Sequence, residues 1–360
     1  MQAGAVCLWQ VATGIPPGNW IEPDELVDLH IDPPMKVPRT VGELRAALEP
    51  ARRAGRTIGL VPTMGALHEG HLSLIARARS QCEIVVVSLF VNPAQFDEHA
   101  DLARYPRQED SDRRLAAQAG ADILFAPTPE EVYPAGFSTS VEVLGLTDRF
   151  ESAVRGSAHF RGVTTVVCKL LNMVLPDVAY FGQKDAQQLI VIRRLVEDLN
   201  LPVRIEACPT IREPDGLAMS SRNAHLSPDE RARAVALHGA LTAAREAAGG
   251  GEQATDSLLQ VAREAMARFD VEPEYLALVS PDMLEPVSRL KEPALLAVAA
   301  RVGATRLIDN ATLYPTLQPI PQPPIQLTSN PTLRPVPQPV MRAPDPHQVN
   351  PTEAQATCSA

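Results

Sequence analysis

Residues 61–71 have the sequence VPTMGALHEGH, which is the most informative stretch of the chain for its fold. It follows an apolar segment, 57–62, that we predict as a strand, and it leads into a predicted helix over 71–80. A helix start offers free backbone N–H groups and a partial positive charge, which suit a phosphate. An open parallel sheet binds its ligands outside the carboxyl ends of its strands. We therefore expect a phosphate-binding site at this strand-to-helix turn.

Outward from this turn, apolar strands alternate with helices. The strands lack polar alternation, so both of their faces are expected to be buried, as in a parallel sheet covered by helices. This repetition predicts an α/β fold with a Rossmann-like, doubly wound parallel sheet. Further strands are predicted over 84–91, 122–126, 178–181 and 203–207, and helices over 41–54, 111–119, 162–174 and 186–199.

The pattern changes after Arg222. Residues 227–230, SPDE, have the features of a helix start: a serine cap, a first-turn proline and acidic residues. One Ala-rich helix should run to about residue 248, where three glycines stop it. A helix over 254–269 and strands over 274–278, 294–300 and 305–310 should follow. We predict a Rossmann-like domain over 35–212 and a second, smaller α+β domain over 213–313.

The two ends differ from the rest of the chain. Residues 1–34 show no periodicity, so either Met35 is the true start or the segment is a genuine, poorly ordered extension. Residues 314–360 are rich in Pro, Gln, Thr and Ser and cannot bury enough apolar surface to fold, which predicts a disordered, partly polyproline II tail. Its Pro-x-Pro repeats could dock an SH3-like or WW-like partner. A tail without a partner is the favoured interpretation.

Composition excludes several classes of protein. The 360 residues carry a net charge of -10, which disfavours non-specific nucleic-acid binding, and 4% aromatic residues disfavour stacking on single strands. No apolar run is long enough for a membrane span, and no signal peptide is evident. The five cysteines are scattered without a Cys-x-x-Cys pair, which argues against disulfides or zinc. We expect a cytoplasmic protein.

His68 and His71 lie on either side of Gly70 within residues 61–71. Imidazole groups at this point can donate hydrogen bonds to phosphate oxygens and stabilise charge that builds between the α and β phosphates. The alternatives are a capping histidine, a solvated turn or half of a metal site, although the His-Glu-x-x-His spacing of zinc enzymes is absent. With its strand and helix, the motif resembles the His-x-Gly-His signature of nucleotidyltransferases and class I aminoacyl-tRNA synthetases, which implies attack on the α-phosphate of ATP.

Six segments, in order, resemble the pantothenate synthetase family. They are PTMGALHEGH (62–71), FVNPAQF (90–96), YPR (105–107), HFRGV (159–163), FGQKDAQQ (181–188) and DGLAMSSRN (215–223). The resemblance covers roughly residues 37–313. It implies a Rossmann-like ATP- and pantoate-binding domain with a lid-like C-terminal domain, usually in a homodimer. It also implies condensation of (R)-pantoate with β-alanine through a pantoyl adenylate, with release of AMP and pyrophosphate.

The resemblance also implies roles for single residues in ATP binding. His71 matches the catalytic histidine, His68 its phosphate-binding companion, and Lys184 and Arg222 the cations at the triphosphate. Ile211 matches a position whose backbone contacts the adenine. The complete ATP set comprises Met64, Gly65, Ala66, Leu67, His68, Glu69, Gly70 and His71, then Gly182, Gln183, Lys184 and Asp185, then Ile211, and finally the clamp loop of Met219, Ser220, Ser221 and Arg222.

Two glutamines match the family's pantoate contacts, Gln95 and Gln188, and Gln95 also matches its β-alanine contact. An amide both donates and accepts, so it can orient a carboxylate and hydroxyls without adding a charge. Taken singly, such residues have simpler explanations. Gln188 could be a surface amide, Lys184 a solvated turn lysine, Arg222 a surface ion pair of little energetic worth, and His159 a structural histidine.

The chain departs from the family pattern at two positions. Gln183 stands where the family usually has glutamate, and Arg155 lies one position away from the usual arginine before His159. The resemblance implies Mg²⁺ with the ATP, but its ligands are not identified by the sequence; Asp110 and Asp112 are acidic candidates.

Two other classes of function remain open at this point. One is an adenylyl- or cytidylyltransferase, which would not need Gln95 and Gln188. The other is a non-catalytic scaffold that presents the Pro-rich tail; it predicts losses in the ATP motifs, whereas His68, His71, Lys184 and Arg222 are all present.

Overall fold

The computed structural model describes residues 35–96, 102–103 and 105–316. It does not describe the side chains of residues 152–155 and 157. The predictions for segment 1–34, for the tail from residue 317 onward and for the side chain of Arg155 therefore lie outside the described residues.

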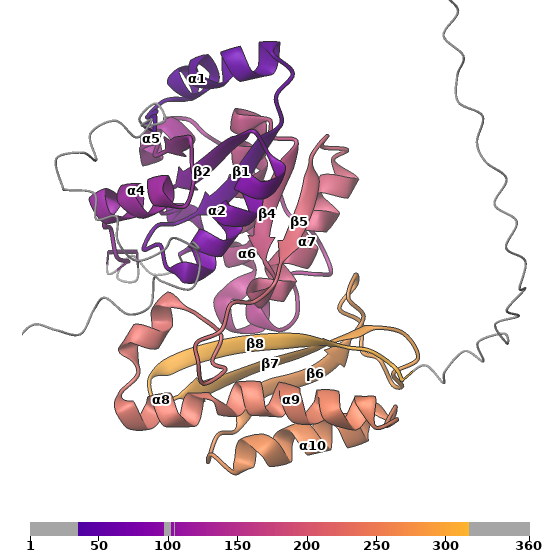
Figure 1. The fold of residues 1–360 in the computed structure, drawn as a ribbon. Helices are drawn as coiled ribbons and strands as arrows, with labels where there is room; N and C mark the ends of the chain where they lie inside the picture. The colour runs from indigo at the N-terminus through magenta and orange to yellow at the C-terminus, as the bar shows by residue number, and fades with distance from the viewer. Residues whose placement is uncertain (1–34, 97–101, 104, 317–360) are drawn as a thin grey trace, which may run out of the picture. The chain divides into compact units, whose positions relative to one another are not determined.

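A five-stranded sheet forms the N-terminal half of the fold (Figure 1). Its strands are β1 (Ile58–Thr63), β2 (Ile84–Leu89), β3 (Ile123–Phe125), β4 (Val178–Gly182) and β5 (Arg204–Cys208). They lie in the order β3-β2-β1-β4-β5, and every pairing is parallel. The order reverses between β1 and β4, which is the doubly wound arrangement. This confirms the predicted fold class.

Helices cover both faces of this sheet because both faces of its strands are apolar. On one face, α1 (Val41–Arg53), α6 (Glu151–Val174) and α7 (Ala186–Asp198) pack against side chains such as Leu60 and Val86. On the other face, α2 (Glu69–Gln81) and α4 (Glu109–Gln118) pack against Val85 and Val87. Adjacent strand residues point to opposite faces, so the unbroken apolar runs serve both layers.

Several short elements were absent from the sequence prediction. They are α5 (Pro129–Val132) and the 3₁₀ turns η2 (Pro93–Gln95), η3 (Gln183–Asp185) and η4 (Ser221–His225). The helix predicted from residue 162 begins earlier, at Glu151, and is kinked at Gly156, where φ is 75° and ψ is 156°. The prediction missed this first part because it lacks apolar periodicity.

The C-terminal part contains a three-stranded antiparallel sheet in the order β6-β7-β8. The strands are β6 (Pro273–Val279), β7 (Ala294–Val302) and β8 (Thr305–Leu313). Figure 1 shows α9 (Ala236–Gly249) and α10 (Thr255–Ala267) against one face of this sheet, and their apolar side chains share one core with it. Ser227 caps α8 (Pro228–Ala234) as predicted.

The prediction of one continuous helix from residue 228 to 248 was wrong, because Val235 interrupts it. Its φ of -64° and ψ of -13° end α8 and start α9. The described residues up to Thr316 nevertheless form one compact unit. Among them, no helix combines the length and apolarity needed to cross a membrane.

Candidate active site

The candidate site lies where the strand order of the parallel sheet reverses. β1 and β4 are neighbours, and the segments that leave their carboxyl ends are residues 64–71 and the η3 turn. The connections that follow β1 and β4 carry the chain in opposite directions along the sheet, and this opens a crevice at the carboxyl edge. Two of the predicted ATP segments, far apart in sequence, therefore meet at one point.

The two histidines of the 61–71 stretch build the start of α2 together. His68 is the N-cap, and its Nδ1 accepts the backbone N–H of Gly70 at 3.1 Å. Nδ1 of His71 in turn accepts the backbone N–H of His68 at 3.3 Å. The two rings lie 4.1 Å apart between centroids. A Cβ on residue 70 would lie 2.8 Å from the ring of His68, so this turn requires glycine.

These caps determine the tautomers of both rings. Burial, with the positive charge of Lys184 nearby, lowers the pKa of His68. Burial, followed by the neighbouring His68, lowers the pKa of His71 from 6.5 to about 3. Both rings are therefore neutral at pH 7. Because each Nδ1 accepts a backbone N–H, the single ring proton of each histidine is on Nε2. Each Nε2–H is thus available as a hydrogen-bond donor.

The loop before the histidines is held by Asp112 of α4. Its carboxylate oxygens accept the backbone N–H of Leu67 at 2.7 Å and of Ala66 at 3.0 Å. The Asp112 side chain is buried, and residues 65 and 66 both have positive φ. A buried carboxylate that accepts two backbone N–H groups fixes a strained turn. Asp112, considered above as a metal ligand, therefore uses both oxygens to shape the predicted ATP loop.

Gln95 ends the η2 turn and is oriented from two sides. Its Nε2 donates to Sδ of Met64 at 2.8 Å, and its Oε1 accepts from Nδ2 of Asn92 at 3.1 Å. Nδ1 of His159, on α6, lies 2.8 Å from the carbonyl oxygen of Gln95. Asn92, which is buried, also donates to the carbonyl of Gly162 at 3.1 Å. A Cβ on residue 162 would overlap the Ala94 carbonyl, so glycine allows η2 to contact α6.

Lys184 and Asp185 lie on the η3 turn beside the histidines. Nζ of Lys184 is 3.7 Å from Oδ1 of Asp185, and the lysine side chain is only 16% exposed. From β8, Asn310 donates through Nδ2 to the backbone carbonyls of Gln183 and Lys184, at 2.9 and 2.8 Å. These two bonds hold the backbone of the turn that carries the predicted triphosphate cation, Lys184.

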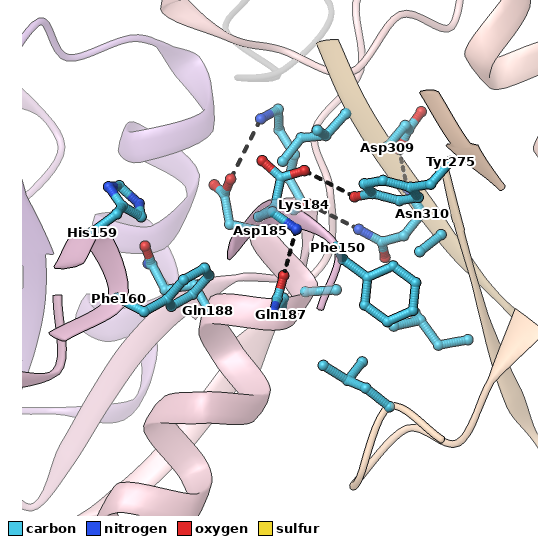
Figure 2. Close-up of a pocket in the computed structure, with 16 residues that line it drawn as sticks. Phe150, His159, Phe160, Lys184, Asp185, Gln187, Gln188, Tyr275, Asp309 and Asn310 are labelled. Atoms are coloured by element: carbon cyan, nitrogen blue, oxygen red, sulfur yellow. Dashed lines mark hydrogen bonds and ion pairs between the residues drawn. The ribbon is translucent and has the colours of Figure 1, made fainter. Parts of the chain in front are cut away.

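A pocket opens next to this turn (Figure 2). His159, Lys184 and Gln188 line it on the side of the parallel sheet. Tyr275 and Asn310 line it on the side of the antiparallel sheet. Gln188 is partly buried and lines this pocket, so it is not the surface amide considered above.

The predicted clamp loop runs into the η4 turn. The Met219 N–H donates to the Ile211 carbonyl at 2.9 Å, so the adenine-side segment and the clamp are joined directly. Ser220 caps η4 through its hydroxyl, which accepts the Arg222 N–H at 3.3 Å. Asn223 donates to the Ala218 carbonyl at 3.0 Å. The Arg222 side chain is exposed, and its charge acts on the hydroxyl of Tyr105.

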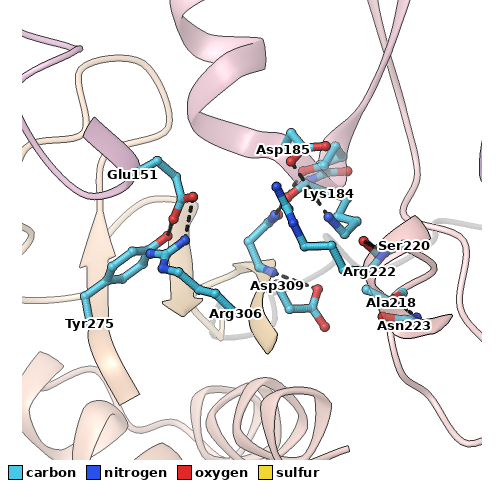
Figure 3. A network of polar contacts seen from close by, with 12 residues as sticks. Glu151, Lys184, Asp185, Ala218, Ser220, Arg222, Asn223, Tyr275, Arg306 and Asp309 are labelled. Atoms are coloured by element: carbon cyan, nitrogen blue, oxygen red, sulfur yellow. Dashed lines mark hydrogen bonds and ion pairs between the residues drawn. The ribbon is translucent and has the colours of Figure 1, made fainter. Parts of the chain in front are cut away.

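Two ion pairs with buried carboxylates connect β8 to the segments around the site. Arg212 makes a bidentate pair with Asp309, at 2.6 and 3.1 Å. Arg306 pairs with Glu151 at 2.7 Å, and the Tyr275 hydroxyl donates to the same carboxylate at 3.0 Å (Figure 3). Their burial makes these pairs far more costly to break than surface pairs.

The structure thus brings most of the predicted site together. His68, His71, Lys184 and Asp185 meet at the crevice. The Gln95 carbonyl contacts His159, and Gln188 lines the same pocket as His159. Sequence reasoning did not predict the supporting roles of Asp112, Asn92 and Asn310, although it named Asp112 as a candidate metal ligand. The only available signal was their polar character within or beside apolar elements.

Comparison with known proteins gives a consistent result. The family model for pantoate-beta-alanine ligase matches residues 36–312. A curated relative, pantothenate synthetase 1 of Bradyrhizobium diazoefficiens, is 54% identical over 280 residues, which cover 78% of this chain and 98% of the relative.

Two solved structures are also similar to this chain. The pantothenate synthetase of Thermus thermophilus is 49% identical, with a TM-score of 0.73, over 78% of this chain and 100% of that one. The pantoate-beta-alanine ligase of Francisella tularensis, solved with Beta-gamma ATP and Beta-alanine, is 33% identical, with a TM-score of 0.63, over 77% of this chain and 97% of that one.

Proposed function

The chain belongs to the pantoate–β-alanine ligase family, and on this premise we propose roles for its own residues in the family reaction. The enzyme condenses (R)-pantoate with β-alanine through a pantoyl adenylate, and AMP and pyrophosphate are released. The nucleotidyltransferase and scaffold alternatives do not account for a family match over residues 36–312.

One observation carries the assignment of roles. Two neutral imidazoles, each with its proton on Nε2, lie beside Lys184 at the crevice between β1 and β4. Neutral donors can bind the triphosphate without being titrated near pH 7, and Lys184 supplies the positive charge. This arrangement supports ATP binding on residues 64–71 and 182–185, with His71 acting at the α-phosphate and His68 beside it.

In the first half-reaction, the pantoate carboxylate attacks the α-phosphate and pyrophosphate leaves. Negative charge grows on the bridging and non-bridging oxygens, and the Nε2–H donors and Lys184 stabilise it more in the transition state than in the ground state. Met219, Ser220, Ser221 and Arg222 close over the triphosphate in this proposal, and Ile211 contributes its backbone to the adenine. The bond between Met219 and Ile211 supports a coupled movement of both.

Gln95 and Gln188 hold pantoate in the proposal. The amide of Gln95 is oriented by Asn92 and Met64, so its position is set before the substrate binds. In the second half-reaction, the amine of β-alanine attacks the adenylate carbonyl and AMP leaves. The Gln95 carbonyl contacts Nδ1 of His159, which also lines the pocket next to η3, and this supports a second role of Gln95 as the β-alanine contact.

Mg²⁺ enters, in this proposal, as part of the substrate MgATP. Both oxygens of Asp112 already accept backbone N–H groups, which does not fit a role as a metal ligand. The triphosphate oxygens would therefore hold the ion, and its charge would offset theirs. Lys184 and the two histidines remain the protein's own contribution.

We also propose that residues 213–313 act as a lid and that the enzyme is a cytoplasmic homodimer. Exposed apolar side chains, such as Leu144 and Phe137, are candidates for an interface. Cys82, Cys168 and Cys208 are free thiols, which supports a reducing compartment. Light scattering at micromolar concentration tests the dimer.

Pantoate-dependent exchange of labelled pyrophosphate into ATP, without β-alanine, tests the roles of the site. Gln188→Leu should raise the KM for pantoate at least tenfold and leave the KM for ATP within twofold. Gln260→Leu is the matched control, because Gln260 is an exposed amide on α10 that donates a hydrogen bond to Glu264 of its own helix. A Gln188→Leu enzyme with an unchanged pantoate KM would contradict the assignment.

A further inference from the structure

Asn310 contacts the η3 turn although it belongs to the antiparallel sheet. Its Nδ2 group donates one hydrogen bond to the Gln183 carbonyl at 2.9 Å and one to the Lys184 carbonyl at 2.8 Å. Figure 2 shows the Asn310 side chain directed at the turn that carries Lys184 and Asp185. Both amide protons are therefore used on two successive backbone carbonyls of the ATP segment.

The hydrogen-bonding pattern requires an amide at this position. Asn310 is 5% exposed, and among the described residues its Oδ1 has no hydrogen-bond partner. Burial of an unpaired oxygen is unfavourable, so the side chain is oriented by its donors alone. A carboxylate would place oxygen against two carbonyl oxygens, and an apolar side chain would leave both carbonyls without these donors.

The position of Asn310 in β8 explains why its side chain contacts η3. β8 contacts the η3 turn. Adjacent strand residues point to opposite faces. Asp309 therefore shares the helix-covered face with the core residues Ala311 and Leu313, where it pairs with Arg212. Asn310 points the other way, to η3.

We propose that Asn310 is a positioning residue that holds the η3 turn so that the Lys184 ammonium group is directed at the triphosphate. The inference rests on the proposed role of Lys184 and deepens it. The C-terminal sheet thereby contributes to adenylation through a residue that does not itself touch ATP. The neighbouring Asp309 holds the segment that leads to the clamp loop, so two consecutive residues of β8 support two ATP segments.

Steady-state kinetics of the Asn310→Ala and Asn310→Asp variants test this proposal. Both variants should raise the KM for ATP at least tenfold and lower kcat, while the KM for pantoate changes less than threefold. Leu313→Ala is the control for a general loss of stability, because Leu313 is a fully buried core residue of the same strand. If Leu313→Ala, at a similar Tm, raises the ATP KM as much as Asn310→Ala does, the positioning role is overturned.

A double-mutant cycle separates this inference from the role of Lys184. If Asn310 acts through Lys184, then Asn310→Ala should change the kinetics of a Lys184→Ala enzyme less than threefold. If the effects of Asn310→Ala and Lys184→Ala on the kinetics multiply in the double mutant, the inference is overturned and the role of Lys184 stands. Unchanged kinetics in Lys184→Ala alone would overturn the proposed role of Lys184 and this inference with it. If the Asn310→Asp variant does not fold, the cycle with Asn310→Ala still tests whether Asn310 acts through Lys184.

Discussion

The backbone N–H of His68 donates to Nδ1 of His71 at 3.3 Å, so the ring of the second histidine binds the backbone of the first. Nδ1 of His68 accepts the Gly70 N–H in the same turn. Through Nδ1 the two histidines cap the start of α2, and this leaves the proton of each ring on Nε2. Their tautomers follow from the helix start itself.

His71→Ala should lower the rate of pantoyl adenylate formation by about 10²–10³-fold, because it removes a donor that stabilises transition-state charge. The measurement is pantoate-dependent exchange of pyrophosphate into ATP, and circular dichroism checks that the fold is retained. Wild-type-like exchange in a folded variant would rule out His71 as the catalytic histidine.

The low pKa of His71 predicts how stability depends on pH. Folding lowers this pKa from 6.5 to about 3, so the unfolded chain binds more protons between these values. Stability therefore falls as the pH falls below 6.5. In His71→Asn this contribution is absent, and the Tm should fall less steeply between pH 7.5 and 4.5 than in the wild type. Parallel Tm curves would show that His71 does not have a depressed pKa.

Asp112→Asn should weaken ATP binding by disturbing the turn over residues 65–67. The change replaces one charged acceptor of a backbone N–H with a donor. We expect the free energy of unfolding to fall by about 2 kcal/mol and the KM for ATP to rise about tenfold. Asp110→Asn is the control, since it removes the same charge from an exposed residue in the same helical turn. Equal effects of the two substitutions would contradict the anchoring role.

Gly162→Ala should raise the KM for pantoate, because its Cβ would overlap the Ala94 carbonyl and displace the η2 turn that carries Gln95. Overpacking of this kind costs about 1–3 kcal/mol. Gly239→Ala, in α9, is the matched control: its Cβ would meet only Phe269, at 4.0 Å, and the change should stabilise the protein by about 0.4–1 kcal/mol. A Gly162→Ala enzyme with unchanged stability and pantoate KM would show that the close contact with η2 is not required.

Local features of the fold were predictable from sequence. Ser227 and Pro228 define a helix start through interactions within one turn, and the apolar runs of β1 and β2 define buried parallel strands. The interruption at Val235 was not predictable, because its dihedral angles remain close to helical and its neighbours are good helix formers. The short 3₁₀ turns also escaped prediction, since they are shaped by contacts with other elements.

The same distinction applies to the site. The cap that joins His68 to His71 lies within four residues, and the motif lies after β1 at the carboxyl edge of the sheet, as the local pattern predicted. The supports lie far away in sequence: Asp112 is 46 residues from Ala66, and Asn310 is 127 residues from Gln183. Contacts between residues so far apart in sequence depend on the order of the strands, and a local sequence pattern carries no information about that order.

AMP release from ATP and Mg²⁺, with pantoate and β-alanine each present or omitted, tests whether this chain catalyses both half-reactions. We expect stoichiometric AMP and pantothenate when both organic substrates are present. With pantoate alone, we expect pyrophosphate release limited to about one equivalent per site. Steady pyrophosphate release without pantoate, or AMP release that does not depend on β-alanine, would contradict the assignment of this chain as a pantoate–β-alanine ligase.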